Sequence, residues 1–259
     1  MVHIPKQGEA TQRSKDEQQA DLLLRKMTVD FLTKNETILN SPHWNWHLST
    51  FMRRQTLSRL LYLDELYRKI VDVPGVILEF GVQHGATLSI LNSLRGIHEP
   101  YNHSRTIVGF DTFEGFEGVS KLNDPEVVKS GQYSVSNDWE VELESIITLQ
   151  QQFSPLSHIN KFELIKGNLI ETFPNWLETN PGLSVAMVIF DVDIYEPTKY
   201  AIEKVIPRLT KRSLLVFDEF SCKHFAGETI AAMDSIGLNN LNLYRSPLQP
   251  FCAFGFLGD

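Results

Sequence analysis

The chain of 259 residues is 42% hydrophobic and 22% charged, and its formal net charge is −8. The composition is that of a globular protein, and the acidic balance argues against nucleic acid as a partner, because binding phosphates requires a basic face. The longest apolar runs fall far below the roughly 18 residues that a membrane-spanning helix needs, which argues against a membrane partner. The polar N-terminal segment lacks the apolar core of a signal peptide, and the two cysteines, Cys222 and Cys252, match no metal-binding spacing. We therefore expect a cytoplasmic protein with unpaired thiols.

The N-terminal part of the chain, residues 1–72, predicts a helical extension. Residues 1–18 are polar and are expected to be disordered. Apolar residues then recur at helical spacing over 20–39 and again over 48–70, which predicts two helices joined by a turn rich in aromatic residues and histidine. We expect the extension to cap a site or to form an oligomer surface, with residues 73–259 forming the catalytic domain.

The next stretch predicts a strand, a glycine turn and a helix. Val76–Leu78 is a short apolar run typical of a buried strand, and Glu79 is expected to end it. Gly81 and Gly85 bracket a turn, and residues 86–94 are expected to form a helix. Open α/β sheets hold nucleoside-like ligands with this arrangement. The spacing G-x-x-x-G differs from the dinucleotide fingerprint, and a βα turn that merely needs glycine would show the same pattern.

Strands and helices alternate through the rest of the chain. We predict strands at 106–110, 162–165, 185–190 and 214–217, helices at 139–153, 170–178, 196–209 and 227–236, and two C-terminal strands near 241–245 and 251–256. This alternation predicts an α/β fold, a Rossmann-like doubly wound, mostly parallel, seven-stranded sheet with an antiparallel edge. The long polar loop at 114–138 is expected to be a mobile lid that a ligand orders, because long loops inside compact domains are usually functional.

Polar residues follow each central strand of the predicted sheet. They are Glu79, Asp111, Gly167, Asn168, Asp191, Asp193, Asp218 and Glu219. Ligands of open α/β sheets bind beyond the carboxyl ends of the strands, so we expect these residues to meet at one edge. Any one acid is explained equally well as a helix N-cap, but several converging carboxylates repel one another and call for a cation. Oxygen ligands select Mg²⁺, Mn²⁺ or Ca²⁺.

The acid that ends the second strand, Asp111, has two carboxylate oxygens that can accept both hydroxyls of a ribose. This arrangement favours an adenosine-type ligand.

Five short motifs in this order resemble the macrocin O-methyltransferase (TylF-type) family of class I S-adenosylmethionine-dependent methyltransferases. They read E-F-G-V-x-x-G, F-D-T-F-E-G, K-G-N, D-V-D-I-Y-E-P-T and F-D-E-F, and the resemblance covers roughly residues 74–235. It implies methyl transfer to a sugar hydroxyl in the biosynthesis of natural products such as antibiotics. The acceptor would be a nucleotide-activated, rhamnose-like deoxysugar or a glycosylated compound. The resemblance also implies Mg²⁺ dependence and a homo-oligomer.

The resemblance assigns a set of residues to S-adenosylmethionine. They are Glu79, Gly81 and Gly85 in the first cofactor motif, Asp111 and Thr112 at the ribose, Gly167 and Asn168 beside the adenine, and Asp191. Thr112 stands where the family usually has serine.

The resemblance also implies a metal site and leaves the catalytic base open. Asp191, Asp218 and Glu219 correspond to metal ligands, and Glu219 stands where the family usually has the shorter aspartate. A carboxylate within hydrogen-bond reach can take the proton of the acceptor hydroxyl. We expect Asp193 to be this base, although its role and that of Asp191 are interchangeable at this stage. His224 is a second candidate base.

Three other interpretations compete with this one. Tyr195 and Lys199 fit the Y-x-x-x-K pair of short-chain dehydrogenases, but Pro197 is expected to place Tyr195 before its helix, and no dinucleotide fingerprint precedes the pair. A second interpretation keeps S-adenosylmethionine and replaces the sugar by a catechol or another small molecule. A third is a non-enzymatic Rossmann-like binding protein, which would have no need of convergent acids.

Overall fold

The computed structural model describes residues 14–258 and divides the chain into two compact units between Leu60 and Leu61. Each unit is described by itself. The disorder predicted for residues 1–18 falls mostly outside the described residues, and for residues 15–18 it is wrong. Ser14 and Glu17 form a capping box that starts a helix there, because each side chain accepts a hydrogen bond from the other residue's backbone N–H.

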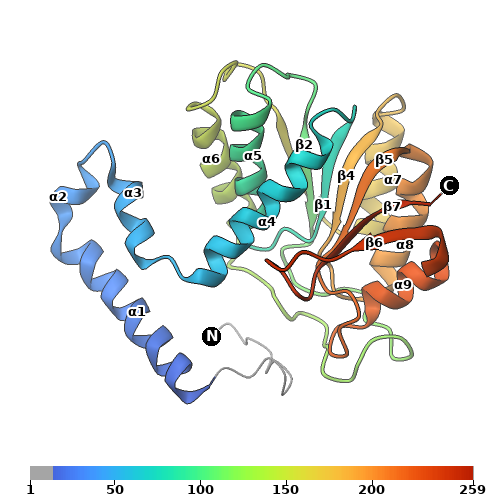
Figure 1. The fold of residues 1–259 in the computed structure, drawn as a ribbon, viewed down its shortest axis with the longest axis horizontal. Coiled ribbons are helices and arrows are strands. Elements are labelled where there is room, and N and C mark those ends of the chain that lie inside the picture. The colour runs from blue at the N-terminus through green and yellow to red at the C-terminus, as the bar shows by residue number, and fades with distance from the viewer. Residues whose placement is uncertain (1–13, 259) are drawn as a thin grey trace. The chain divides into compact units, whose positions relative to one another are not determined.

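The N-terminal unit consists of short and medium helices (Figure 1). They are α1 (Lys15–Lys34), α2 (Glu36–Leu39), α3 (Trp44–Leu48), the 3₁₀ turn η2 (Ser49–Phe51) and the first part of α4 (Arg54–Ile70). The helix predicted over 48–70 therefore begins later than expected, and the aromatic stretch before it forms α3 instead of a turn. Phe31 packs on Phe51 with ring centroids 5.0 Å apart, and Arg53 forms an ion pair of 2.7 Å with Asp21.

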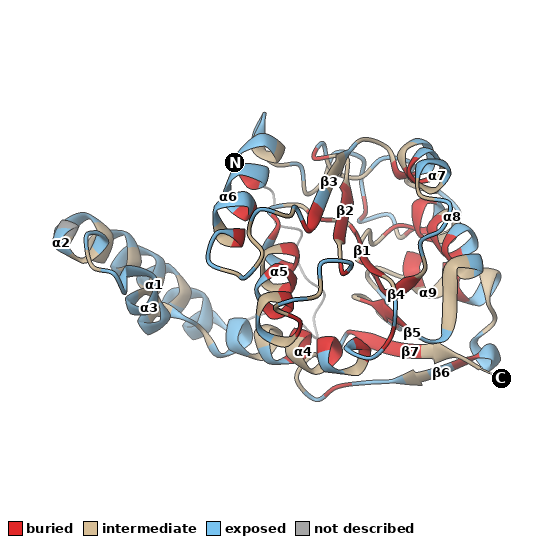
Figure 2. Cartoon of the chain, turned by 90° about the horizontal axis from the view of Figure 1, so that it is seen from above, coloured by how far each residue is buried: buried red, intermediate tan, exposed pale blue. Residues whose placement is uncertain are grey.

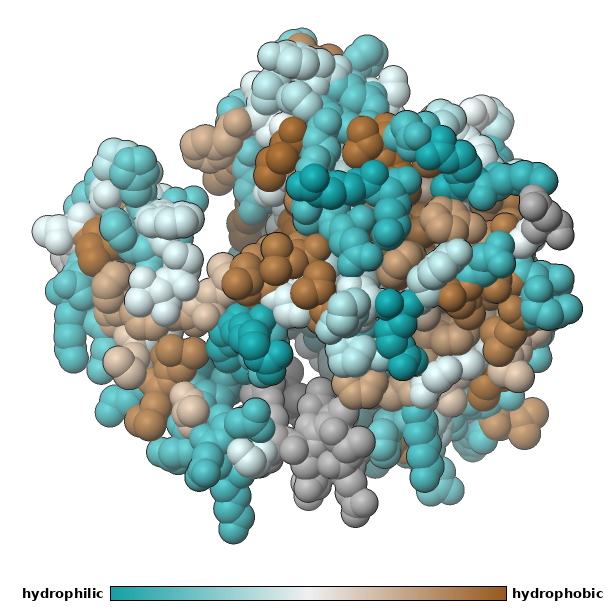
Figure 3. Space-filling model, in the orientation of Figure 1, coloured by the Kyte–Doolittle hydropathy of each residue, from teal (hydrophilic) through white to brown (hydrophobic). Residues whose placement is uncertain are grey.

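Apolar side chains of the N-terminal unit remain exposed, and brown patches mark apolar surface on it in Figure 3. Helix α1 buries none of its residues, and neither does α3. The exposed side chains include Leu22, Leu23, Met27, Val29, Trp44 and Trp46. Despite this apolar content, none of the helices in the described residues is long and apolar enough to cross a membrane.

The second unit contains one seven-stranded sheet with the order β3-β2-β1-β4-β5-β7-β6. The strands are β1 (Val76–Phe80), β2 (Ile107–Asp111), β3 (Phe162–Lys166), β4 (Val185–Phe190), β5 (Leu209–Phe217), β6 (Leu241–Tyr244) and β7 (Ala253–Leu257). The first five run parallel, and β7 is antiparallel to both β5 and β6. The predicted doubly wound sheet with an antiparallel edge is confirmed.

Two strand boundaries differ from the prediction. Strand β1 continues to Phe80, so Glu79 lies inside the strand and is buried. Strand β5 begins at Leu209, four positions before its buried half, because Leu209 already pairs with Val185 of β4, whereas the exposed polar residues that follow it interrupt the register. A hydrophobic pattern marks only the buried part of such a strand.

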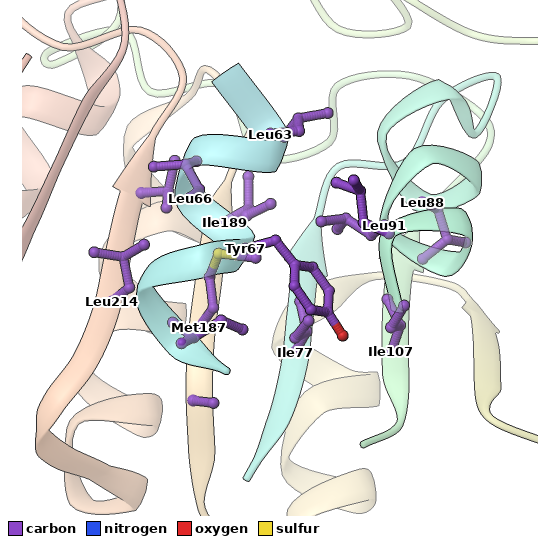
Figure 4. Packing of buried hydrophobic residues seen from close by; sticks show 14 of the residues in the cluster. Leu63, Leu66, Tyr67, Ile77, Leu88, Leu91, Ile107, Met187, Ile189 and Leu214 are labelled. Carbon is purple, nitrogen blue, oxygen red and sulfur yellow. The ribbon is translucent and has the colours of Figure 1, made fainter. Parts of the chain in front are cut away.

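Helices cover both faces of the sheet, and the central strands between them are buried (Figure 2). The helices of this unit, besides the second half of α4, are α5 (Ala86–His98), α6 (Trp139–Gln151), α7 (Leu169–Thr179), α8 (Tyr195–Val205) and α9 (Gly227–Ser235), with 3₁₀ turns at Ile206–Arg208 and Leu238–Asn240. One core cluster joins α4, α5 and α6 to one face of the sheet, and a second joins α7, α8 and α9 to the other. Figure 4 shows Leu66 and Tyr67 of α4 packed over Ile77, Met187 and Ile189.

A buried ion pair fastens the C-terminus of α4 to the sheet. The Arg105 guanidinium donates to a Glu99 carboxylate oxygen over 2.8 Å and to the carbonyls of Ile70 and Val73 over 3.0 and 2.8 Å. The Tyr67 hydroxyl donates to the same carboxylate over 2.7 Å. Burial alone would raise the pKa of Glu99, but the hydrogen bonds from Arg105 and Tyr67 lower it below its ordinary value.

Replacing Glu99 with glutamine is expected to lower the free energy of unfolding by about 3 kcal/mol at pH 7, because Arg105 stays buried without its counter-charge. Since the folded-state pKa of Glu99 is depressed, its contribution is present above the unfolded pKa of about 4.3 and is lost as the pH falls through the folded value. The difference in the free energy of unfolding between wild type and variant should therefore become smaller at acidic pH. Urea unfolding across this pH range measures it.

The matched control is Asp72→Asn, which breaks the ion pair between Asp72 and Arg212. Both side chains of this pair are exposed. It should leave the urea midpoint unchanged. Equal stability of wild type and Glu99→Gln at pH 7 would show that the buried pair is energetically neutral.

Candidate active site

A cavity of about 340 Å³ lies where the parallel strands end. Its lining includes the predicted residues Glu79, Gly81, Asp111, Thr112, Gly167, Asn168, Asp191, Asp193, Asp218 and Glu219. The predicted convergence of these residues at one edge of the sheet is confirmed, while their individual roles stay predictions. Gly85 and His224 are not among the lining residues. The volume falls in the usual range of small-molecule sites.

Glycine is required at the two positions of the first turn for different structural reasons. Gly81 has φ +93°, and a Cβ there would lie 1.8 Å from the carbonyl oxygen of Asp191, so only glycine lets the turns after β1 and β4 come together. Gly85 has φ +82° at the N-cap of α5, and its Cβ would lie 2.3 Å from a methyl group of Leu143 on α6. Gly85 therefore serves helix packing behind the turn.

The carboxylate of Asp111 holds the glycine turn in place. One oxygen accepts hydrogen bonds from the backbone N–H groups of Val82 and Gln83 over 2.6 and 2.7 Å, and the other accepts from Phe113 over 2.6 Å. A carboxylate offers about four lone-pair positions, so these three bonds leave room for one more donor. A role at the ribose stays a prediction, and the structure adds a second role in shaping the turn.

Asn168 connects the end of β3 to the long loop. Its side-chain oxygen caps α7 by accepting from Ile170 N–H over 3.0 Å, and its amide nitrogen donates to Glu117 over 3.0 Å. Glu117 lines the cavity and was missed by the sequence analysis. It belongs to a polar loop with several acids, and no pattern distinguishes it from its neighbours.

The acids after β4 and β5 crowd one side of the cavity. Burial raises the pKa of Asp193 well above its usual range, and the negative charges of Glu219 and Asp218 raise it further. The backbone of Asp193 lies in the left-handed region with φ +60°. This repulsion is what a divalent cation would relieve, so the donor set fits a hard metal ion in chemistry.

The metal site predicted at Asp191, Asp218 and Glu219 stays a prediction. Within residues 14–258, no three acidic, histidine or cysteine side chains are arranged to hold a metal ion. The Asp218 carboxylate accepts a hydrogen bond of 3.3 Å from the Cys252 thiol, and the Cys222 thiol hydrogen-bonds to Glu219. Neither thiol belongs to a disulfide.

The loop expected to be a mobile lid has internal structure. Phe116 and Gln132 pair through a backbone hydrogen bond of 3.0 Å, and the ring of Phe116 meets Tyr133 edge to face at 5.2 Å. At its middle, the buried Asp124 accepts hydrogen bonds from Ser120 and Tyr195 N–H over 2.7 and 2.8 Å. The loop is thereby fastened to the start of α8.

Tyr133 is a second loop residue that the sequence analysis missed, and it lines the same cavity as the acids. Its backbone has φ +66°, which is unusual for a residue other than glycine. Burial raises the pKa of its phenol, and the charges of Asp193, Glu219 and Asp191 raise it further, so the hydroxyl stays protonated and can donate.

The Y-x-x-x-K pair is structural. Helix α8 begins at Tyr195, so the expectation that Tyr195 precedes the helix is wrong. Pro197 sits in the first turn, where its missing N–H is not needed. The Tyr195 hydroxyl hydrogen-bonds to Asp234 over 2.7 Å and accepts from Lys199 over 3.0 Å, linking α8 to α9. Neither residue of the pair lines the cavity, and the dehydrogenase interpretation loses its support.

Comparison with known proteins decides the family. A sequence profile described as Macrocin-O-methyltransferase (TylF) matches residues 21–235. The chain belongs to the macrocin O-methyltransferase family. No curated protein matches the chain.

Two solved structures of one protein are similar over nearly the whole chain. The crystal structure of CalS11, described as a calicheamicin methyltransferase, has a TM-score of 0.85 at 35% identity and covers 96% of this chain and 95% of its own. Apo CalS11, described as a TDP-rhamnose 3'-O-methyltransferase, has a TM-score of 0.78 at 33% identity and covers 96% and 97%. The O-methyltransferase NovP, with a TM-score of 0.60 at 15% identity over 78% and 80%, shares the fold.

The family assignment agrees with the position of the cavity. The chain is an O-methyltransferase, and its family implies S-adenosylmethionine as the methyl donor. The glycine turn after β1 and the acids after β4 and β5 line the same cavity. In an open α/β sheet this crevice beyond the strand ends is where ligands bind.

Asp111→Ala is expected to weaken binding of S-adenosylhomocysteine about 10- to 100-fold in calorimetry, because both the turn and the ribose lose a partner worth about 1–3 kcal/mol. The control Glu126→Ala removes an exposed acid of the loop that follows β2; this acid does not line the cavity, and the variant should bind like wild type.

A 2'-deoxy analogue separates the two roles of Asp111. If the carboxylate contacts the ribose, wild type should discriminate against the analogue and Asp111→Ala should not. If wild type and variant discriminate equally, Asp111 only holds the turn. If the variant binds S-adenosylhomocysteine with unchanged affinity, neither role contributes to cofactor binding.

Proposed function

We propose that this enzyme transfers a methyl group from S-adenosylmethionine to a ring hydroxyl of a nucleotide-activated, rhamnose-like deoxysugar in natural-product biosynthesis. The observation that carries the proposal is the 35% identity to CalS11 over 96% of the chain, because CalS11 is described as a TDP-rhamnose 3'-O-methyltransferase. The acids that line the same cavity as the glycine turn support it.

The donor side of the cavity is formed by the turns after β1, β2 and β3. Gly81 is proposed to let the cofactor approach the backbone closely. Glu79 and Asp191 line the cavity beside Gly81 and are proposed to flank the cofactor. Asp111 and Thr112 are proposed to meet the ribose, and Gly167 and Asn168 are proposed to lie beside the adenine. Gly85 acts through the shape of the turn, since it does not line the cavity.

The acceptor side is formed by the acids after β4 and β5. In the proposed reaction the bond between sulfur and the methyl carbon breaks while the acceptor oxygen forms its bond to that carbon. The hydroxyl proton moves to a carboxylate, for which we propose Asp193, with Asp191 able to exchange roles with it. His224 does not line the cavity, so the proposal gives it no part in proton transfer.

Asp191, Asp218 and Glu219 are proposed to hold Mg²⁺, or Mn²⁺ or Ca²⁺. The bound ion would lower the pKa of the acceptor hydroxyl and orient two neighbouring sugar oxygens. Asp218 accepts a hydrogen bond from the Cys252 thiol and Glu219 bonds to the Cys222 thiol, and each carboxylate keeps further lone pairs that can ligate a cation. The sequence alone did not reveal these contacts.

The N-terminal unit is proposed to contribute to a homo-oligomer. Its helices α1 and α3 bury none of their residues, although they carry leucines, a methionine and two tryptophans. Exposed apolar patches of this kind mark association surfaces.

The proposal is tested by incubating the protein with S-adenosylmethionine, Mg²⁺ and a panel of nucleoside diphosphate sugars, followed by mass spectrometry. A rhamnose-like deoxysugar nucleotide should gain one methyl group, excess EDTA should abolish the gain, and Mg²⁺ should restore it. Methylation of catechols alone would move the substrate to another class, and full turnover in EDTA would contradict the metal role.

Asp218→Asn completes this test. The variant should keep wild-type affinity for S-adenosylhomocysteine, because the donor side lies at strands β1 to β3. It should lose about 100-fold or more in kcat, since metal Lewis-acid catalysis supplies several kcal/mol of stabilisation in the transition state. Loss of cofactor affinity in equal measure would show that Asp218 acts on the fold.

A further inference from the structure

The first turn of α9 contacts the backbone of both acidic turns. Glu228 is fully buried, and one of its carboxylate oxygens accepts a hydrogen bond of 3.3 Å from Asp193 N–H. Its other oxygen accepts from Glu219 N–H over 3.1 Å. A single side chain therefore joins the turn after β4 to the turn after β5.

The residues beside Glu228 contact neighbouring atoms of the same two turns. The Thr229 hydroxyl accepts a hydrogen bond of 2.8 Å from Ser221 N–H. Gly227 approaches so closely that a Cβ would lie 2.6 Å from the carbonyl oxygen of Asp193 and 2.6 Å from Tyr195 N. Only glycine permits this approach, and it brings the carboxylate of Glu228 within reach of both turns.

The clamped turns include residues in an unfavourable backbone conformation. Asp193 has φ +60° and Ser221 has φ +57°, and neither is glycine. Such conformations persist only where surrounding structure over-determines them, and they gather at functional sites. Glu228 accepts a hydrogen bond from the N–H of Asp193, and Thr229 accepts one from the N–H of Ser221, which lies beyond the acids that follow β5.

Stability alone gives a poor account of Glu228. Its carboxyl group is fully buried, and burying a polar group is unfavourable unless its hydrogen bonds are needed. An apolar residue would fill the same space without that penalty, but it would leave two backbone N–H groups without an acceptor.

We propose that Glu228 is a positioning residue, which fixes the proposed base Asp193 and the proposed metal ligand Glu219 relative to each other by holding their backbone N–H groups. This inference rests on the proposed function. Glu228 does not line the cavity, so it acts through the two turns that it holds.

The test is Glu228→Gln, which keeps the shape of the side chain but replaces one acceptor oxygen by an amide that cannot accept. Turnover should fall about 10- to 100-fold, the usual effect of losing a residue that orients the groups of a site. Affinity for S-adenosylhomocysteine should stay at the wild-type value, because the donor side of the cavity is not clamped by α9. The effect therefore falls on kcat.

Thr229→Val is the matched control. It removes a hydrogen bond from the same turn of α9 to the same acidic loop but leaves the N–H groups of Asp193 and Glu219 bonded. Its kcat should remain near wild type. Hydrogen exchange tests the clamp without an activity assay. Amide exchange over residues 191–195 and 218–221 should be faster in Glu228→Gln than in wild type, whereas Thr229→Val should leave residues 191–195 protected.

Wild-type kcat in Glu228→Gln would overturn the proposal, as would an equal loss of kcat in Thr229→Val. If Glu228→Gln does not fold, exchange in the wild type decides: unprotected N–H groups at Asp193 and Glu219 would refute the clamp. A wild type that methylates no sugar, with both N–H groups protected, would overturn the proposed function and with it the catalytic part of this inference.

Discussion

Backbone N–H groups bonded to carboxylates from other parts of the chain fix the turns around the cavity. Asp111 holds the glycine turn after β1, Asp124 holds the start of α8, and Glu228 holds the turns after β4 and β5. The bonds of Asp111, Asp124 and of Glu228 to Asp193 join segments distant in sequence, whereas the bond of Glu228 to Glu219 spans nine residues. The strand ends of a parallel sheet are loops, and without such bonds their side chains would have no fixed positions.

The two ends of the sheet use charge in opposite ways. Around the C-terminus of α4, Glu99 and Arg105 are buried as a fully hydrogen-bonded pair. At the carboxyl ends of the strands, acids crowd a single cavity, and repulsion from Glu219 and Asp218 contributes to the raised pKa of Asp193. Like charges held close together oppose stability, so the rigid scaffold beneath them must compensate. That imbalance is typical of sites that act on a ligand or bind a cation.

Much of the fold was predictable, because the buried strands appear as apolar runs and each ends in polar residues. The boundaries that failed depend on hydrogen bonding instead of hydrophobicity: Leu209 starts β5 through pairing alone, and Tyr195 starts α8 because Asp124 accepts its N–H.

The convergence of the acids was also predictable, since the carboxyl ends of parallel strands share one edge. Glu117 and Tyr133 were not, because their loop has no periodic pattern, and Glu228 was not, because its role depends on the approach of α9 to two turns. The hydrogen bonds of Asp218 and Glu219 with the thiols of Cys252 and Cys222 were not predictable either, because they too depend on tertiary contacts.

The central claim is that one cavity holds the methyl donor on its glycine side and a cation on its acid side. A crystal structure with S-adenosylhomocysteine and Mn²⁺ tests it most directly, because the anomalous signal of manganese locates the ion independently. The account predicts the ribose beside Asp111 and the ion among Asp191, Asp218 and Glu219. A manganese peak outside this cavity, or a cofactor bound elsewhere, would contradict it.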